Sequence, residues 1–152
     1  MTDSEESLTP AQVRDLRRIA GIMIPASKEH DVPGADDPAI FHDILSSLGR
    51  DLGDVRVALR ELALLAGGAF ADLEATRAEA ATESFHAKAS PSAVALGRVI
   101  LQCYYRDDRV LISLGLEPRP PFPQGHTLEQ GDWSLLDAVR GRPRLWRDDR
   151  GI

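Results

Sequence analysis

The sequence predicts an all-α fold, a single domain of five or six helices followed by an extended, proline-rich C-terminal arm. Three observations carry this prediction. A helix-capping residue directly precedes a proline at three places, and apolar residues recur at helical spacing after each pair. Four of the ten prolines lie within 118–123, and proline disfavours helix. We therefore expect an acidic, flexible N-terminus at 1–7, a helical domain at 8–116 and the extended arm at 117–152.

The first two helices are predicted to begin at Thr9-Pro10 and Asp37-Pro38. In each pair, the first side chain can accept hydrogen bonds from free N–H groups, and the proline ring already has the backbone angle of a first helical turn. Pro25 should end the first helix and Gly49 the second. The apolar residues on their inner faces are Val13, Leu16, Ile19, Ala20, Met23 and Ile24, then Ile40, Phe41, Ile44, Leu45 and Leu48.

The strongest helical pattern runs from Asp51 to Leu73, with Gly67-Gly68 as its weak point. Each glycine costs about 1 kcal/mol relative to alanine inside a helix, so the pair predicts either a break or the close approach of another backbone. We interpret it as a kink or a close contact. Residues 72–89 are rich in Ala and Glu, with Phe85 as the single large apolar anchor after Leu73, which favours a more exposed fourth helix.

A fifth helix should begin at Ser90-Pro91, and a short sixth helix at Asp108. The run 99–105 has the composition of a strand, but its cap and its length favour helix. The sixth helix should stop at Gly115. The residues expected to point inward are Ala93, Leu96, Ile100, Cys103 and Tyr104 in the fifth helix, and Val110, Leu111 and Leu114 in the sixth.

The segment 117–152 contains both tryptophans, Trp133 and Trp146, and several aliphatic residues around them. Its acidic and basic residues balance, and disordered tails rarely have this composition. We therefore expect an ordered arm that lies on its own helices or on a partner.

Composition excludes several classes of function. The chain has 152 residues, 43% of them apolar, with a net charge of -6 and a pI near 5.2, which argues against a nucleic-acid binder. The single Cys103 excludes an internal disulfide framework and any multi-cysteine metal cluster. No apolar run is long enough for a membrane span, and no signal segment is visible. The expected location is the cytoplasm, with export to the periplasm alongside a partner as the alternative.

Motifs of small-molecule chemistry are not found. The four histidines form no metal-binding pair, and there is no nucleophile elbow, phosphate loop or dinucleotide fingerprint. We therefore predict no catalytic, cofactor-binding or metal-binding residues, and interpret Cys103 as a packing group. The alternative is a small helical enzyme or ligand-binding domain that acts alone, with His42, His86 and aspartates gathered around a metal or a pocket.

The most informative cluster is 104–110, followed by the proline-rich stretch and Trp133. Tyr, Trp and Arg concentrate at the centres of protein interfaces, because they bury a large area and still carry a polar group. The competing interpretation is that these aromatic side chains close the core of the domain itself. The predicted partner-binding residues are Tyr104, Tyr105, Arg106, Arg109, Pro121, Phe122, Trp133 and Trp146.

Several short motifs resemble a known family. They are Leu8-Thr9-Pro10, Ile24-Pro25, Val32-Pro33-Gly34-Ala35, and Tyr104-Tyr105 followed by a short helix to Leu114-Gly115-Leu116 and a proline-rich exit. Together they resemble the gluconate 2-dehydrogenase subunit 3 family, the small gamma subunits that accompany flavin dehydrogenases of the glucose-methanol-choline type. The resemblance covers residues 8–123 in outline.

The resemblance implies a mostly helical, non-catalytic accessory subunit. Such a subunit binds the large FAD-dependent subunit of a sugar or alcohol dehydrogenase and helps it fold, stay in solution, take up flavin or reach its compartment. FAD and the catalytic histidine would belong to the large subunit, with no cofactor in this chain. Many relatives carry a twin-arginine export signal, whereas Arg17-Arg18 here lies inside the first predicted helix. The segment with Trp133 and Trp146 extends beyond the resemblance.

Overall fold

The computed structural model describes residues 7–120, 122–126 and 129–143, and the predicted all-α class is confirmed there. These residues form seven α-helices and three short 3-10 helices, without a β-strand. The chain divides into two compact units, the first ending at Arg119 and the second beginning at Pro120. Each unit is described by itself below.

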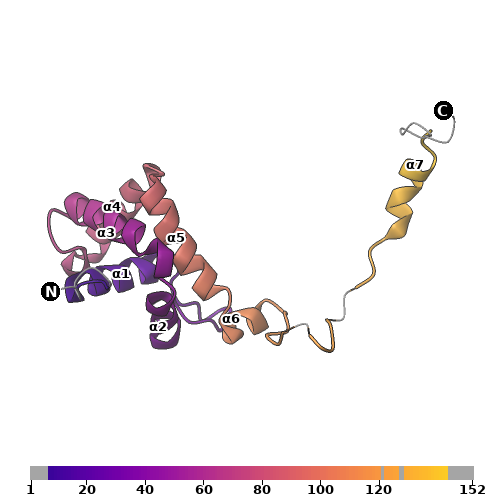
Figure 1. Ribbon diagram of the computed structural model, residues 1–152, viewed down its shortest axis with the longest axis horizontal. Coiled ribbons are helices and arrows are strands. Elements are labelled where there is room, and N and C mark those ends of the chain that lie inside the picture. The colour runs from indigo at the N-terminus through magenta and orange to yellow at the C-terminus, as the bar shows by residue number, and fades with distance from the viewer. Residues whose placement is uncertain (1–6, 121, 127–128, 144–152) are drawn as a thin grey trace. The chain divides into compact units, whose positions relative to one another are not determined.

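Six of the α-helices lie in the first unit (Figure 1). They are α1 (Pro10–Met23), α2 (Pro38–Ser46), α3 (Leu52–Ala66), α4 (Ala75–Ala87), α5 (Pro91–Tyr104) and α6 (Asp108–Ser113), with the 3-10 helices η1 (Gly49–Asp51) and η2 (Phe70–Asp72). The second unit contains η3 (Trp133–Leu136) and α7 (Asp137–Arg140).

All three predicted proline-linked helix starts are confirmed. The Thr9 hydroxyl accepts a hydrogen bond from the N–H of Gln12 at 3.3 Å, and the Gln12 side chain accepts one from the N–H of Thr9 at 3.0 Å. This reciprocal pair is a capping box. The Asp37 carboxylate caps α2 by accepting from the N–H groups of Ala39 and Ile40, and the Ser90 hydroxyl accepts from the N–H of Ala93 at 3.2 Å. The segment with strand-like composition is helical, as its cap predicted.

The core of the first unit lies around α3, which packs against both α4 and α5. α1 covers α3, α4 and η2, while α2 packs against α5 (Figure 1). The largest fully buried side chains come from every one of these elements: Leu16, Ile19, Ile40, Ile44, Val55, Leu59, Leu62, Phe70, Phe85, Leu96, Ile100 and Val110. The apolar stripes read from the sequence therefore meet in one hydrophobic cluster.

The glycine pair ends α3 instead of kinking it. Gly67 follows the last helical residue with a left-handed φ of 72°, and its N–H bonds to a carbonyl of the last turn. A Cβ added at Gly67 or Gly68 would meet no atom within 4 Å. The expected close approach of another backbone is therefore wrong. The pair ends the helix instead, with a left-handed backbone conformation that is strained for any residue with a Cβ.

The short α6 differs from its prediction at its end. Val110 is buried as expected, but Leu114 follows the last helical residue and is exposed. Helical spacing would place Val110 and Leu114 on one face, but α6 ends at Ser113, so this spacing does not extend to Leu114. Leu114 therefore belongs to the surface.

The two ends of the chain leave two predictions open. Residues 1–6 of the predicted flexible N-terminus lie outside the described residues, and the Ser7 carbonyl accepts a hydrogen bond from the Arg56 guanidinium. In the second unit, η3 and α7 add helical turns that the sequence did not predict. An arm that lies on its own helices or on a partner stays a prediction.

A tight loop joins α1 to α2 and explains the glycine in the Val-Pro-Gly-Ala motif. Arg17 in α1 donates two hydrogen bonds, of 3.1 and 3.0 Å, to the Asp36 carbonyl oxygen. The N–H of Ala35 bonds to the Ile24 carbonyl at 2.9 Å, which closes the loop over Gly34. A Cβ at Gly34 would lie 2.9 Å from the backbone nitrogen of Ala26 and 2.6 Å from the Asp36 carboxylate. Backbone crowding therefore requires glycine at this position.

Gly34→Ala is expected to lower the free energy of unfolding by about 1–3 kcal/mol, because backbone atoms cannot move away as a flexible side chain would. The matched control is Gly53→Ala in α3, where an added Cβ meets no atom within 4 Å. That control should stabilise the protein by about 0.5–1 kcal/mol through helix propensity. Urea unfolding of both variants measures the difference, and equal stabilities would contradict the crowding argument.

Candidate partner-binding surface

Arg109 joins two helix N-termini that lie far apart in the sequence. Asp37 caps α2 and Asp107 caps α6, and both carboxylates accept hydrogen bonds from the Arg109 guanidinium. The Arg109 Nη2 atom lies 2.8 Å from Asp37 Oδ1 and 2.9 Å from Asp107 Oδ2. This arrangement fastens α6 to the start of α2.

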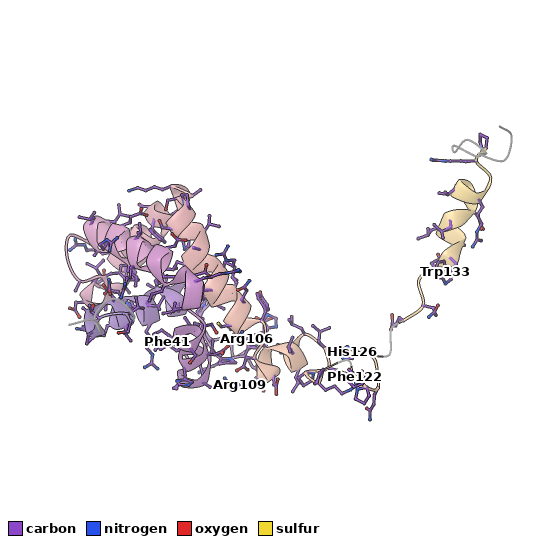
Figure 2. All side chains as sticks on the ribbon, viewed as in Figure 1. Phe41, Arg106, Arg109, Phe122, His126 and Trp133 are labelled. Carbon is purple, nitrogen blue, oxygen red and sulfur yellow. The ribbon has the colours of Figure 1, made fainter. Side chains whose placement is uncertain are left out.

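Arg106, in the turn between α5 and α6, makes a second connection to α2. Its guanidinium donates in a forked manner to both Asp43 oxygens on α2, and also to the Ser47 hydroxyl. Figure 2 shows both arginines at the junction of α2, α5 and α6. Arg106 and Arg109, predicted to bind a partner, are therefore engaged in ion pairs that hold this junction, while about half of each side chain remains exposed.

These ion pairs shift the titration of their carboxylates. Hydrogen bonds from Arg109 lower the pKa values of Asp37 and Asp107 below the usual aspartate range, and Arg106 lowers the pKa of Asp43. A carboxylate whose pKa is lower in the folded state than in the unfolded state stabilises the fold at pH values above the unfolded-state pKa. That stabilisation is lost as pH falls through the lowered, folded-state value.

We expect Asp37→Ser to lower the free energy of unfolding by about 0.5–1 kcal/mol at neutral pH, since serine keeps the cap but removes the ion pair with Arg109. Asp37→Ala removes both and should cost about 1 kcal/mol more. Chemical unfolding at several pH values checks this. The difference between wild type and Asp37→Ser should shrink in acid, and a difference that grows there would contradict the assignment.

The predicted tyrosine pair separates into a core residue and a surface residue. Tyr104 is 5% exposed and belongs to the hydrophobic cluster, so it is a core residue of this unit and offers little surface to a partner. Tyr105 caps the end of α5, is 53% exposed and stacks edge-on against Tyr104. Consecutive residues on a helix point about 100° apart, which separates the two rings. The competing interpretation, in which these aromatic side chains close the core of the domain, therefore holds for Tyr104 and not for Tyr105.

Large exposed apolar side chains concentrate on α5, α6 and the residues that follow them. Within residues 7–119, six of the eight such side chains are Val94, Leu101, Tyr105, Ile112, Leu114 and Leu116. We call these six residues the α5–α6 surface. The sequence analysis identified only Tyr105 among them. A signal was present, because Arg98 and Gln102 are the charged and amide residues of α5, and Val94 and Leu101 lie beside them at helical spacing on the exposed side.

The second unit exposes further apolar side chains. Phe122 is 85% exposed and Trp133 is 60% exposed. Both residues are labelled in Figure 2. The Asp132 carboxylate accepts from the N–H of Ser134 at 3.0 Å, which caps the helical turns that present Trp133. Leu135, Leu136 and Val139 are exposed beside it. Pro121 and Trp146, the other two residues predicted to bind a partner, lie outside the described residues.

The residues of the alternative prediction form no metal site in the described part of the chain. Among the described residues, no group of three or more His, Cys, Asp or Glu side chains could hold a metal ion, and this includes His42 and His86. Cys103 is buried, and burial raises the pKa of its thiol. No helix in the described part of the chain has both the length and the apolar character needed to cross a membrane.

Comparison of the chain with protein-family models, curated proteins and solved structures finds no match.

Proposed function

We propose that this protein is a non-catalytic accessory subunit that binds and stabilises the large FAD-dependent subunit of a sugar or alcohol dehydrogenase. Its contribution is burial of apolar surface against the partner. The FAD belongs to the large subunit, which carries out the chemistry.

The observation that supports a binding role best is the α5–α6 surface. Its six apolar side chains come from one stretch of chain and lie on a domain whose own core is already complete. Burying a large apolar side chain contributes roughly 1.5–3 kcal/mol relative to full exposure. A partner that covers this surface therefore gains a substantial hydrophobic contribution, which is the usual origin of a stable subunit interface.

The identity of the partner is supported by the resemblance of the short motifs to the small subunits of flavin dehydrogenases. One of these motifs has a structural explanation in this chain, since Gly34 closes the loop between α1 and α2. Tyr105, at the end of α5, belongs both to the motif and to the α5–α6 surface.

The test is purification of the tagged chain from its native cells, followed by a flavin absorbance spectrum and mass identification of the accompanying protein. The expected result is an equimolar complex with a large FAD-containing oxidoreductase that retains flavin. The isolated chain should show neither flavin nor turnover. A chain that purifies alone, or that turns over a substrate by itself, would contradict the proposal.

A further inference from the structure

A pocket open to solvent is lined by residues of α1, of α3 and of the loop that follows α3. Its volume of about 650 Å³ is in the range of sites that hold small organic molecules. The short side chains of its lining leave this space free, so the pocket suits an apolar body. Most of the lining is small or aliphatic, and includes Ala11, Leu59, Ala63, Leu64, Gly67 and Gly68.

Asp15 is the acidic residue of this pocket, and it is buried. It lies in α1 with 6% of its surface exposed, and its Oδ1 accepts a hydrogen bond from the N–H of Ala71 at 2.7 Å. Burial raises the pKa of the Asp15 carboxyl group, although that hydrogen bond and the charge of Arg14 act in the opposite direction. The cost of desolvating the carboxylate therefore exceeds what its neighbours return, and a positive charge in the pocket would stabilise it.

The arginines near the pocket leave this carboxylate without an ion pair. Arg14 pairs with Asp72 instead. Arg60 lines the pocket but is an exposed residue, so water and salt screen its charge. The charge of a buried carboxylate is screened much less, and Asp15 therefore decides which ligand charge the pocket prefers.

The hydrogen bond to Ala71 does not explain why Asp15 is charged. The bond holds the N–H of a residue in η2, but the neutral side-chain carbonyl of asparagine could accept it equally well. A buried charge that the fold does not require, at the side of an apolar pocket, is typical of a binding site.

We propose that this pocket binds a small organic cation, an amine with an apolar body. Its ammonium group pairs with the Asp15 carboxylate, and its hydrocarbon part lies against Leu59 and Ala63. The inference is independent of the proposed accessory role, because no residue of the α5–α6 surface lines this pocket. Either can therefore fail without the other.

Phenethylamine and its neutral analogue phenethyl alcohol test the charge. Each is titrated into the full-length chain at neutral pH, and two-dimensional amide NMR follows the signals of Gly67, Gly68 and Ala69, which line the pocket. We expect saturable shifts, with the amine bound about tenfold or more tightly than the alcohol. Asp15→Asn keeps the acceptor for Ala71 and should abolish this preference. Absence of saturable shifts, equal binding of the two compounds, or an unchanged preference in Asp15→Asn would overturn the inference.

Ala63→Leu tests the pocket itself, because it adds a larger side chain there and leaves Asp15 in place. It should weaken amine binding about tenfold or more. The matched control is Ala87→Leu, an exposed position of α4 outside the pocket, which should bind the amine like the wild type. Circular dichroism verifies folding, and if Asp15→Asn does not fold, the two compounds and this pair of variants decide. Wild-type binding by Ala63→Leu would place the amine elsewhere and overturn the inference.

Discussion

Trp133→Ala is expected to weaken binding of the proposed large FAD-dependent subunit by about 2–4 kcal/mol, about thirty- to a thousandfold in affinity, without loss of helix content. Trp133 lies at the start of η3 and is exposed, so its ring is available to a partner rather than to a core. Tryptophan has the largest side-chain area to bury, which is why it is enriched among the residues that dominate binding. Isothermal titration with the purified large subunit measures the loss, and circular dichroism measures the helix content.

The matched control is Trp133→Phe, which keeps an aromatic ring and should lose about 1 kcal/mol or less of the binding energy. If Trp133→Ala instead lowers the helix content or the melting temperature, Trp133 is a core residue. If a folded Trp133→Ala variant binds with unchanged affinity, Trp133 does not contribute to the interface.

Phe85→Ala should have the largest effect on folding, lowering the free energy of unfolding by about 3–5 kcal/mol. Phe85 is fully buried and is the single large apolar anchor in residues 74–89, the stretch that forms α4. Its removal leaves a cavity and removes the main contact that holds α4 on the domain. A loss of this size is a large part of the 5–15 kcal/mol that stabilises a typical domain. Chemical unfolding followed by circular dichroism measures it.

Leu64→Ala provides the control, because this side chain also lies on a helix but is exposed. Its truncation should change the free energy of unfolding by less than about 0.5 kcal/mol. Similar losses in the two variants would show that α4 is not held by the Phe85 anchor. A selective loss of α4 protection in hydrogen exchange of Phe85→Ala would support that role directly.

The local structure follows closely from the sequence. The proline-linked caps at Thr9, Asp37 and Ser90 begin helices at the predicted residues, because capping depends on groups within one helical turn. Phe85 was identified as an anchor because it is the one large apolar residue in the segment that forms α4. Gly67 was identified as a weak point, but whether it breaks or kinks the helix depends on what lies beside it.

The candidate surface was predicted less completely, because exposure depends on contacts between distant segments. Tyr104 and Tyr105 are adjacent and chemically alike, and only the packing of α5 on the domain makes one of them core and the other surface. The packing of α5 likewise leaves Val94 and Leu101 uncovered, although their residue types suit a core. Arg98 and Gln102 mark the exposed side of α5, but the residue types of Val94 and Leu101 do not show that they lie on that side.

By itself, the sequence determined the all-α class, the starts of the three proline-linked helices and most of the core, because these depend on short-range capping and on the helical period. Only the tertiary structure decided that Arg106 and Arg109 join α2 to α5 and α6, with partners 63 and 72 residues away. It also decided which apolar side chains remain outside the core. The physical reason is that ion pairing and burial depend on distances in space, and the fold sets these distances between segments that the sequence keeps far apart.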